Sequence, residues 1–215
     1  MGEIMERRKI NRTRFFLAFI FTIAIFLIGT WFGQNMLKSK FSEIEEMQND
    51  FRTDMVTIEN EYMLLAQNPC FLLNSSKFAS ELYLMGERLE FMEESYGKYN
   101  KDVLKLKEYY SLLEMRCWLF LKEIKEKCNY DIKTILYFYS NRACNRCAEQ
   151  GYILTFLRNS HPELNIYSFD VDIDNSALDI LKESYGVSSE TLPFIVLENK
   201  TFSGFVSAEK LQNEL

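Results

Sequence analysis

Two cysteines three positions apart, Cys144 and Cys147, are the residues best suited to chemistry in this chain. They follow a β-rich, largely apolar run at 132–139 and precede a helical stretch that extends to about residue 160. At the start of such a helix, the dipole and unpaired amides stabilise a thiolate, so we place Cys144 at the N-cap or in the first turn. Arg142 and Arg146 would lower its pKa further, and Cys147, one turn deeper, could attack a mixed disulfide formed by Cys144. The spacing therefore predicts thiol–disulfide exchange.

Alternating helices and strands must position this pair. Strands are expected at 132–139, 164–169, 194–197 and 201–205, with helices from the cysteines to about 160, at 176–185 and from 207 to 215. The order is βαβ, then a helix, then ββα. The first unit implies a right-handed parallel crossover and the last two strands a hairpin. Residues 131–215 are thus predicted to form an α/β domain.

Three features of this domain resemble the thioredoxin superfamily. Aromatic strand residues lead into the Cys-x-x-Cys pair, acidic residues end the second strand at Asp170 and Asp172, and Thr191-Leu192-Pro193-Phe194 opens the third. The resemblance implies a compact thioredoxin-like fold without a cofactor. It also implies a cis Leu192–Pro193 bond facing the cysteines, with the backbone of Leu192 pairing to a client peptide as an added strand.

The chain also departs from this family. Ala143 replaces the tryptophan that usually precedes the first cysteine, and the inner pair is Asn145-Arg146. The buried acid of the first strand is absent, because Tyr137 and Phe138 occupy that region. Deprotonation of Cys147 then needs water or another group. These changes bear on the direction and rate of the reaction more than on the fold.

The N-terminus carries a membrane signal. Residues 1–14 hold five basic and two acidic side chains, a net charge of +3, which leaves −9 for the rest of a chain whose total is −6. The next 18 residues, 15–32, have no charge and are just long enough to cross a bilayer. We expect a basic cytoplasmic tail at 1–14, a single-pass signal anchor at 15–33 in contact with membrane lipid, and an extracytoplasmic remainder. A cleaved signal peptide and a buried core helix are the alternatives. An acidic body without a basic stripe argues against nucleic acid.

Residues 36–128 show helical heptad spacing. One seam runs through 37–65, a second through 78–96 and a third through 106–124, with Gly97 between the last two. This predicts an all-α region in which a coiled-coil helix precedes an antiparallel hairpin. The first helix could pack on the hairpin or pair with a second copy to give a homodimer.

The remaining cysteines fit this hairpin. Counted from a turn centred between Lys98 and Tyr99, Cys70 and Cys128 lie almost equally far along the two arms. We predict that they form a structural disulfide, the alternative being two free thiols at helix ends. Cys117 falls on the apolar seam and is expected to be a buried, inert thiol.

These observations predict a membrane-anchored extracytoplasmic thiol–disulfide oxidoreductase. Its partners would be client proteins with thiols or disulfides and an unidentified redox partner. The alternative is a non-catalytic interaction or scaffold protein with a redox-inert thioredoxin fold. A metal site is not expected, since zinc normally takes four ligands, no second cysteine pair has ligand spacing, and His161 precedes Pro162 at a turn.

Overall fold

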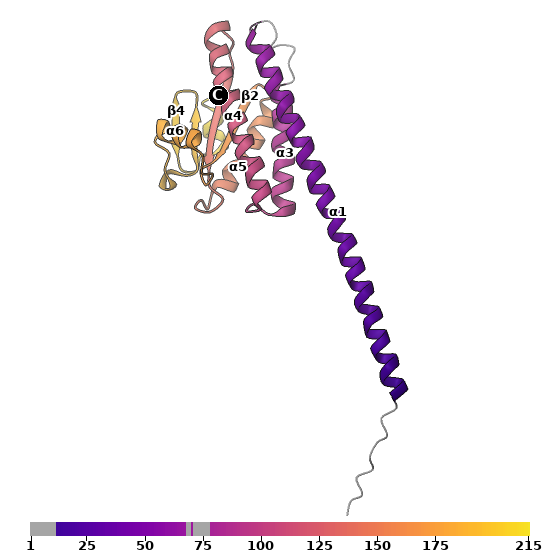
Figure 1. Ribbon diagram of the computed structural model, residues 1–215. Helices are drawn as coiled ribbons and strands as arrows, with labels where there is room; N and C mark the ends of the chain where they lie inside the picture. Colours follow the sequence, from indigo (N-terminus) through magenta and orange to yellow (C-terminus); the bar gives the residue numbers. More distant parts are fainter. Residues whose placement is uncertain (1–11, 68–69, 71–77) are drawn as a thin grey trace, which may run out of the picture. The chain divides into compact units, whose positions relative to one another are not determined.

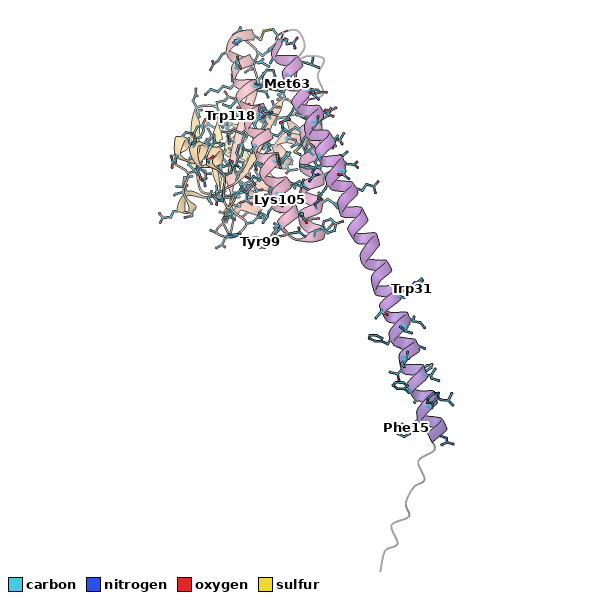
Figure 2. The ribbon with its side chains drawn as sticks, in the orientation of Figure 1. Phe15, Trp31, Met63, Tyr99, Lys105 and Trp118 are labelled. Atoms are coloured by element: carbon cyan, nitrogen blue, oxygen red, sulfur yellow. A yellow bond between two sulfur atoms is a disulfide. The ribbon has the colours of Figure 1, made fainter. Side chains whose placement is uncertain are left out.

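The computed structural model describes residues 12–67, 70 and 78–215, and divides the chain into two compact units, 1–50 and 51–215 (Figure 1). Helix α1, Arg12–Gln67, runs through the boundary without a break. Its segment Arg14–Gly33 has a mean hydropathy of 2.4 and is long and apolar enough to cross a membrane. The side chains of this segment are exposed, including the labelled Phe15 and Trp31 (Figure 2). A single-pass anchor and a signal sequence both fit this helix, and most of the basic tail, residues 1–11, lies outside the described part of the chain.

The second unit begins with the C-terminal part of α1 and the predicted helical hairpin. Helix α3, Phe78–Tyr96, ends before Gly97, which turns the chain with a φ of 95°. Helix α4, Lys101–Cys128, starts at Asn100, whose side chain accepts from the amides of Asp102 and Val103. The two helices agree with the heptad spacing, and the turn between them lies at the predicted glycine.

The apolar stripe of α1 is buried within this chain. Phe51, Ile58 and Leu65 recur every seven residues and are at most 3% exposed. Tyr62 packs edge-on against Phe120 of α4, with ring centroids 4.9 Å apart. The stripe therefore packs on the hairpin, the first of the two arrangements left open by the sequence.

A mixed four-stranded sheet follows the hairpin. Its strands are β1 Lys133–Tyr139, β2 Leu164–Asp170, β3 Phe194–Leu197 and β4 Lys200–Ser203, in the order β2-β1-β3-β4. β1 and β2 are parallel and the other pairs are antiparallel. The helices are α5 Cys147–Ser160, α6 Ser176–Tyr185 and α7 Ala208–Gln212, with a 3₁₀ turn at Ser189–Thr191. The order of elements is the predicted one.

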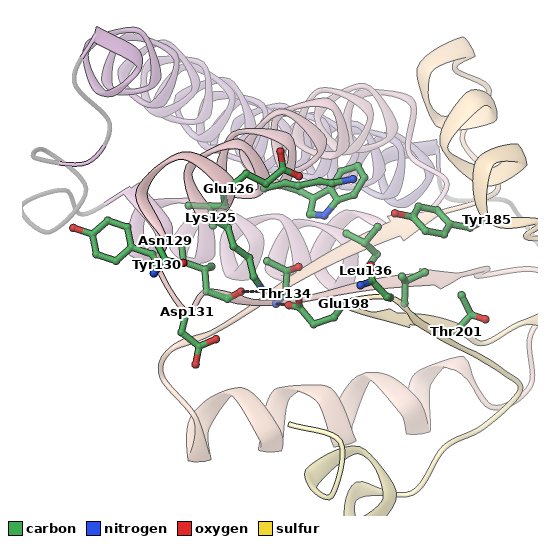
Figure 3. Close-up of a pocket in the computed structure, with 16 residues that line it drawn as sticks. Lys125, Glu126, Asn129, Tyr130, Asp131, Thr134, Leu136, Tyr185, Glu198 and Thr201 are labelled. Atoms are coloured by element: carbon green, nitrogen blue, oxygen red, sulfur yellow. Dashed lines mark hydrogen bonds and ion pairs between the residues drawn. The ribbon is translucent and has the colours of Figure 1, made fainter.

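Helices cover both faces of this sheet. Ile135 and Tyr137 of β1 share a buried cluster with Leu154 and Leu157 of α5 and Leu211 of α7. Alternate residues of β1 point to the other face, where α4 and α6 lie (Figure 3). A helical N-terminal region followed by this mixed sheet is consistent with a thioredoxin-like fold, and hairpin and sheet belong to one compact unit.

Candidate functional site

The two cysteines of the motif are joined in a disulfide at the end of β1. Their Cα atoms are 5.5 Å apart. Cys147 is 4% exposed, whereas Cys144 is only partly buried. An incoming thiolate therefore has better access to the sulfur of Cys144, and Cys147 is the sheltered partner.

The position expected for Cys144, at the N-cap or in the first turn of the helix, is wrong. α5 begins at Cys147, with Arg146 as its N-cap, and the carbonyl of Arg146 accepts the first helical bond from Gln150. Cys144 precedes this cap by two residues because the loop before it is folded by its own hydrogen bonds. Ser140 Oγ accepts from the amides of residues 142 and 143 at 3.0 and 2.8 Å. The helix N-terminus is thus at Cys147, so the dipole acts most directly there.

The two arginines beside the pair are both engaged. Arg146 donates two hydrogen bonds of 3.0 Å to the carboxylate of Glu149, and its guanidinium lies 3.5 Å from the ring centre of Phe205. The guanidinium of Arg142 lies 5.3 Å from the ring centre of Tyr99 on the hairpin turn. Because Glu149 offsets the charge of Arg146, less of it is available to a thiolate than the sequence suggests. A role of Arg142 and Arg146 in lowering the pKa of Cys144 stays a prediction.

Tyr137 of β1 donates a hydrogen bond to the backbone of the cysteine motif. Its buried hydroxyl donates to the carbonyl oxygen of Cys147 at 2.5 Å, and its ring stacks on that of Tyr139. Burial raises the pKa of the Tyr137 hydroxyl, so the group stays neutral. It holds the first turn of α5 against β1 rather than acting as a base. Apart from the tyrosine itself, no signal in the sequence predicts this contact.

A buried ion cluster lies beside the loop that leads to Cys144. The ammonium group of Lys107, on α4, is 2.7 Å from Asp170 at the end of β2 and 2.6 Å from Glu93 on α3. Burial opposes the charged form of Lys107, but Tyr139 and the two carboxylates outweigh it and raise its pKa above the usual value. Sequence reasoning picked out Asp170 and missed Lys107, which stands next to an apolar seam.

The predicted client-binding residues lie directly before β3. The Leu192–Pro193 peptide bond is cis, Pro193 is buried and Leu192 is half-buried. The carbonyl of Thr191 accepts from the amide of Gly204 at 3.0 Å and fixes the preceding turn to the strand hairpin. Pairing of Leu192 with a client peptide stays a prediction.

The second cysteine pair lies at the other end of α4. Cys70 and Cys128 are joined in a disulfide with Cα atoms 5.5 Å apart, and the hydroxyl of Tyr130 donates to the carbonyl of Cys70. Cys117 is a free thiol with no exposed surface, and burial raises its pKa. It is the buried residue that the seam predicts.

Two hollows flank these sites. One, of about 220 Å³, lies between the hairpin turn and the loop at 141–142. The other, of about 880 Å³, lies between the C-terminal half of α4 and the sheet, where Lys125, Leu136 and Tyr185 line it (Figure 3). Within the described residues, no group of three or more His, Cys, Asp or Glu side chains is placed to hold a metal ion.

Comparisons with known proteins find partial structural similarity. No family model matches the chain, and no curated protein matches it. Among solved structures, a malarial protein is 21% identical over 39% of this chain and 92% of its own, with a TM-score of 0.33. Thioredoxin O2 from Arabidopsis thaliana in the oxidized state is 19% identical over 45% of this chain and 84% of its own, with a TM-score of 0.34.

Proposed function

We propose that this protein is a membrane-anchored, extracytoplasmic thiol–disulfide oxidoreductase that exchanges the Cys144–Cys147 disulfide with client protein thiols. The observation that carries the proposal is the asymmetry of the pair: Cys144 is partly exposed in a loop and Cys147 is 4% exposed at the start of α5. An accessible attacking sulfur and a sheltered resolving sulfur are what a two-step exchange requires.

Oxidation of a client proceeds by two displacements. A client thiolate attacks the sulfur of Cys144, forming a mixed disulfide, and Cys147 leaves as a thiolate that takes up a proton. A second client thiolate then attacks the client sulfur of the mixed disulfide and releases Cys144. Two electrons pass from the client to the domain, and a partner disulfide must remove them before the next cycle. The reverse sequence reduces a client disulfide.

The apolar segment of α1 supports the membrane-anchored part of the proposal. Five basic residues precede its uncharged run, 15–32, and two, Lys38 and Lys40, closely follow it. The positive-inside rule then orients the N-terminus to the cytoplasm and the cysteine pairs to the outer side, where disulfides persist. Alkaline phosphatase fused after residue 215 should be active in intact cells, and an inactive fusion of normal abundance would place the domain inside.

The catalytic claim is tested with the full chain in detergent. We expect the wild type to accelerate reduction of insulin by a dithiol, or refolding of a scrambled disulfide protein, and Cys144→Ala to abolish this. Cys117→Ala, the same change at a thiol outside the site, is the matched control and should retain the activity. Equal activity of the wild type and Cys144→Ala would reject the enzyme and favour the non-catalytic interaction protein.

Clients that carry disulfides can be captured by stalling the reductive sequence. In Cys147→Ala, the thiolate of Cys144 attacks a client disulfide, expels one client thiolate and forms a mixed disulfide, but the thiol that would resolve it is absent. Complexes that dissolve on reduction should accumulate with Cys147→Ala. They should be missing from the double variant Cys144→Ala/Cys147→Ala, and their persistence there would assign the capture to another cysteine.

A further inference from the structure

The ion cluster between the helical hairpin and the sheet has a buried cation at its centre. Lys107 is 3% exposed and sits between Asp170, 3% exposed, and Glu93. These three residues come from α4, β2 and α3 respectively. A buried charge is costly unless it is paired, so removing one partner leaves the others without compensation. The cluster is therefore a fixed junction between hairpin and sheet.

Hydrogen bonds continue from this junction into the loop. The Oδ2 atom of Asp170, already bound to Lys107, also accepts from the side-chain amide of Asn141 at 2.9 Å. Its Oδ1 atom accepts from the backbone N–H of Asp172 at 3.0 Å. The carboxylate of Asp172 in turn accepts from the hydroxyl of Ser140 at 2.9 Å and from the backbone N–H of Asn141 at 3.1 Å.

The last links reach the residue before the redox pair. Ser140 Oγ accepts from the amide of Ala143 at 2.8 Å, and Ala143 directly precedes Cys144. Each link in this chain, from the ammonium group on α4 to the amide at 143, is at most 3.1 Å long. We infer that Lys107 is a positioning residue for the thiol–disulfide exchange, and that the helical hairpin is a working part of the redox site.

The consequence for the cysteines is geometric. With the loop fixed, Cys144 is held where its Cα lies 5.5 Å from that of Cys147, which gives the two thiols a high effective concentration. Without the ammonium group, the carboxylate of Asp170 stays buried without the cation that pairs with it, which is costly, and the junction that holds this acceptor beside the loop is lost. The loop then loosens, and the disulfide becomes easier to reduce.

The experiment measures the equilibrium of the Cys144–Cys147 disulfide with glutathione. Full-length protein in detergent is incubated in glutathione buffers, free thiols are alkylated, and the oxidised fraction is read by mass spectrometry. Lys107→Met should lower the equilibrium constant for forming the Cys144–Cys147 disulfide from oxidised glutathione about tenfold. For a two-electron couple this raises the reduction potential of the pair by about 30 mV. Ser140→Ala, which cuts the network at the loop and spares the ion cluster, should shift it in the same direction.

Lys125→Met is the matched control. Lys125 lies on the same helix and also ties α4 to the sheet, with its ammonium group 2.5 Å from Glu198 and 2.9 Å from the carbonyl of Ile132 (Figure 3). This tie is at the N-terminal end of β1, opposite the cysteines. The control should leave the equilibrium within twofold of the wild type. A shift as large as that of Lys107→Met would show general loosening and overturn the inference.

Two further outcomes are decisive. If Lys107→Met folds and its equilibrium constant is within twofold of the wild-type value, the inference is overturned. If Lys107→Met does not fold, an unchanged equilibrium constant in Ser140→Ala overturns it. The inference rests on the proposed function only in taking Cys144 and Cys147 as the reacting pair. A wild type that equilibrates with glutathione but neither reduces insulin nor refolds a scrambled disulfide protein refutes the proposed function, while a shifted equilibrium in Lys107→Met still supports the positioning role.

Discussion

Removing the Cys70–Cys128 disulfide should cost much of the stability of the second unit. The two cysteines are separated by 58 residues. On the chain-entropy model, a bond closing a loop of that length restricts the unfolded state enough to stabilise the fold by about 4 kcal/mol. For a protein of this size, each kcal/mol shifts the melting temperature by roughly 2–4 °C. The double variant Cys70→Ser/Cys128→Ser should therefore melt about 8–16 °C below the wild type.

The assay is thermal unfolding of full-length protein in detergent, followed by the fluorescence of Trp118, which is 9% exposed in the fold. The matched control is Cys144→Ser/Cys147→Ser, which opens a loop with a separation of only three residues and should cost far less. A non-reducing peptide map should contain the 70–128 linkage. A melting temperature within 3 °C of the wild type would refute the reasoning, and so would a peptide map without that linkage.

Two other predictions concern the packing of α4. Burial raises the pKa of Glu114 well above its ordinary 4.5, so the folded chain keeps a proton that the unfolded chain releases, and stability falls as pH rises above about 4.5. Glu114→Gln should therefore be more stable than the wild type at pH 8, by about 1–3 kcal/mol, and equal to it near pH 4 in urea denaturation; the same difference at both pH values would contradict this. A Cβ atom at Gly86 would lie 2.6 Å from the hydroxyl of Tyr110, which donates to the carbonyl of Leu82, so Gly86→Ala should lower the free energy of unfolding by about 1–3 kcal/mol. Gly151→Ala, with nothing within 4 Å of the new Cβ, is the control and should not destabilise, and equal losses in both variants would rule out the close contact as the cause.

The hairpin was predictable because its signals are local. Apolar residues at heptad spacing define α3 and α4, and Gly97 supplies the positive φ that the turn requires. Equal arms then place Cys70 near Cys128, and the structure joins them. Nothing distant in the sequence is needed for this inference.

The start of α5 was not predictable because a distant strand end decides it. Asp172, which follows β2, accepts from Ser140, and Ser140 then binds the loop amides that keep Cys144 out of the helix. The helix therefore starts at Cys147 instead of placing Cys144 at its N-cap or in its first turn, as the motif spacing alone suggests. Lys107 shows the same limit, since its burial depends on meeting Asp170 and Glu93 from two other elements.

The contacts of α4 also explain why the sheet and the hairpin form one unit. β2 is an edge strand of the sheet, and edge strands leave backbone groups unpaired. Glu114 of α4 accepts from the amide of Ser168 on β2, and Glu108 accepts from Asn175 just beyond that strand. Together with Lys107, these residues of one helix satisfy polar groups of β2 and of the segment that follows it. A fragment beginning at residue 131 would lose these partners and leave Asp170 without its cation, so the Cys144–Cys147 pair is best studied with the hairpin attached.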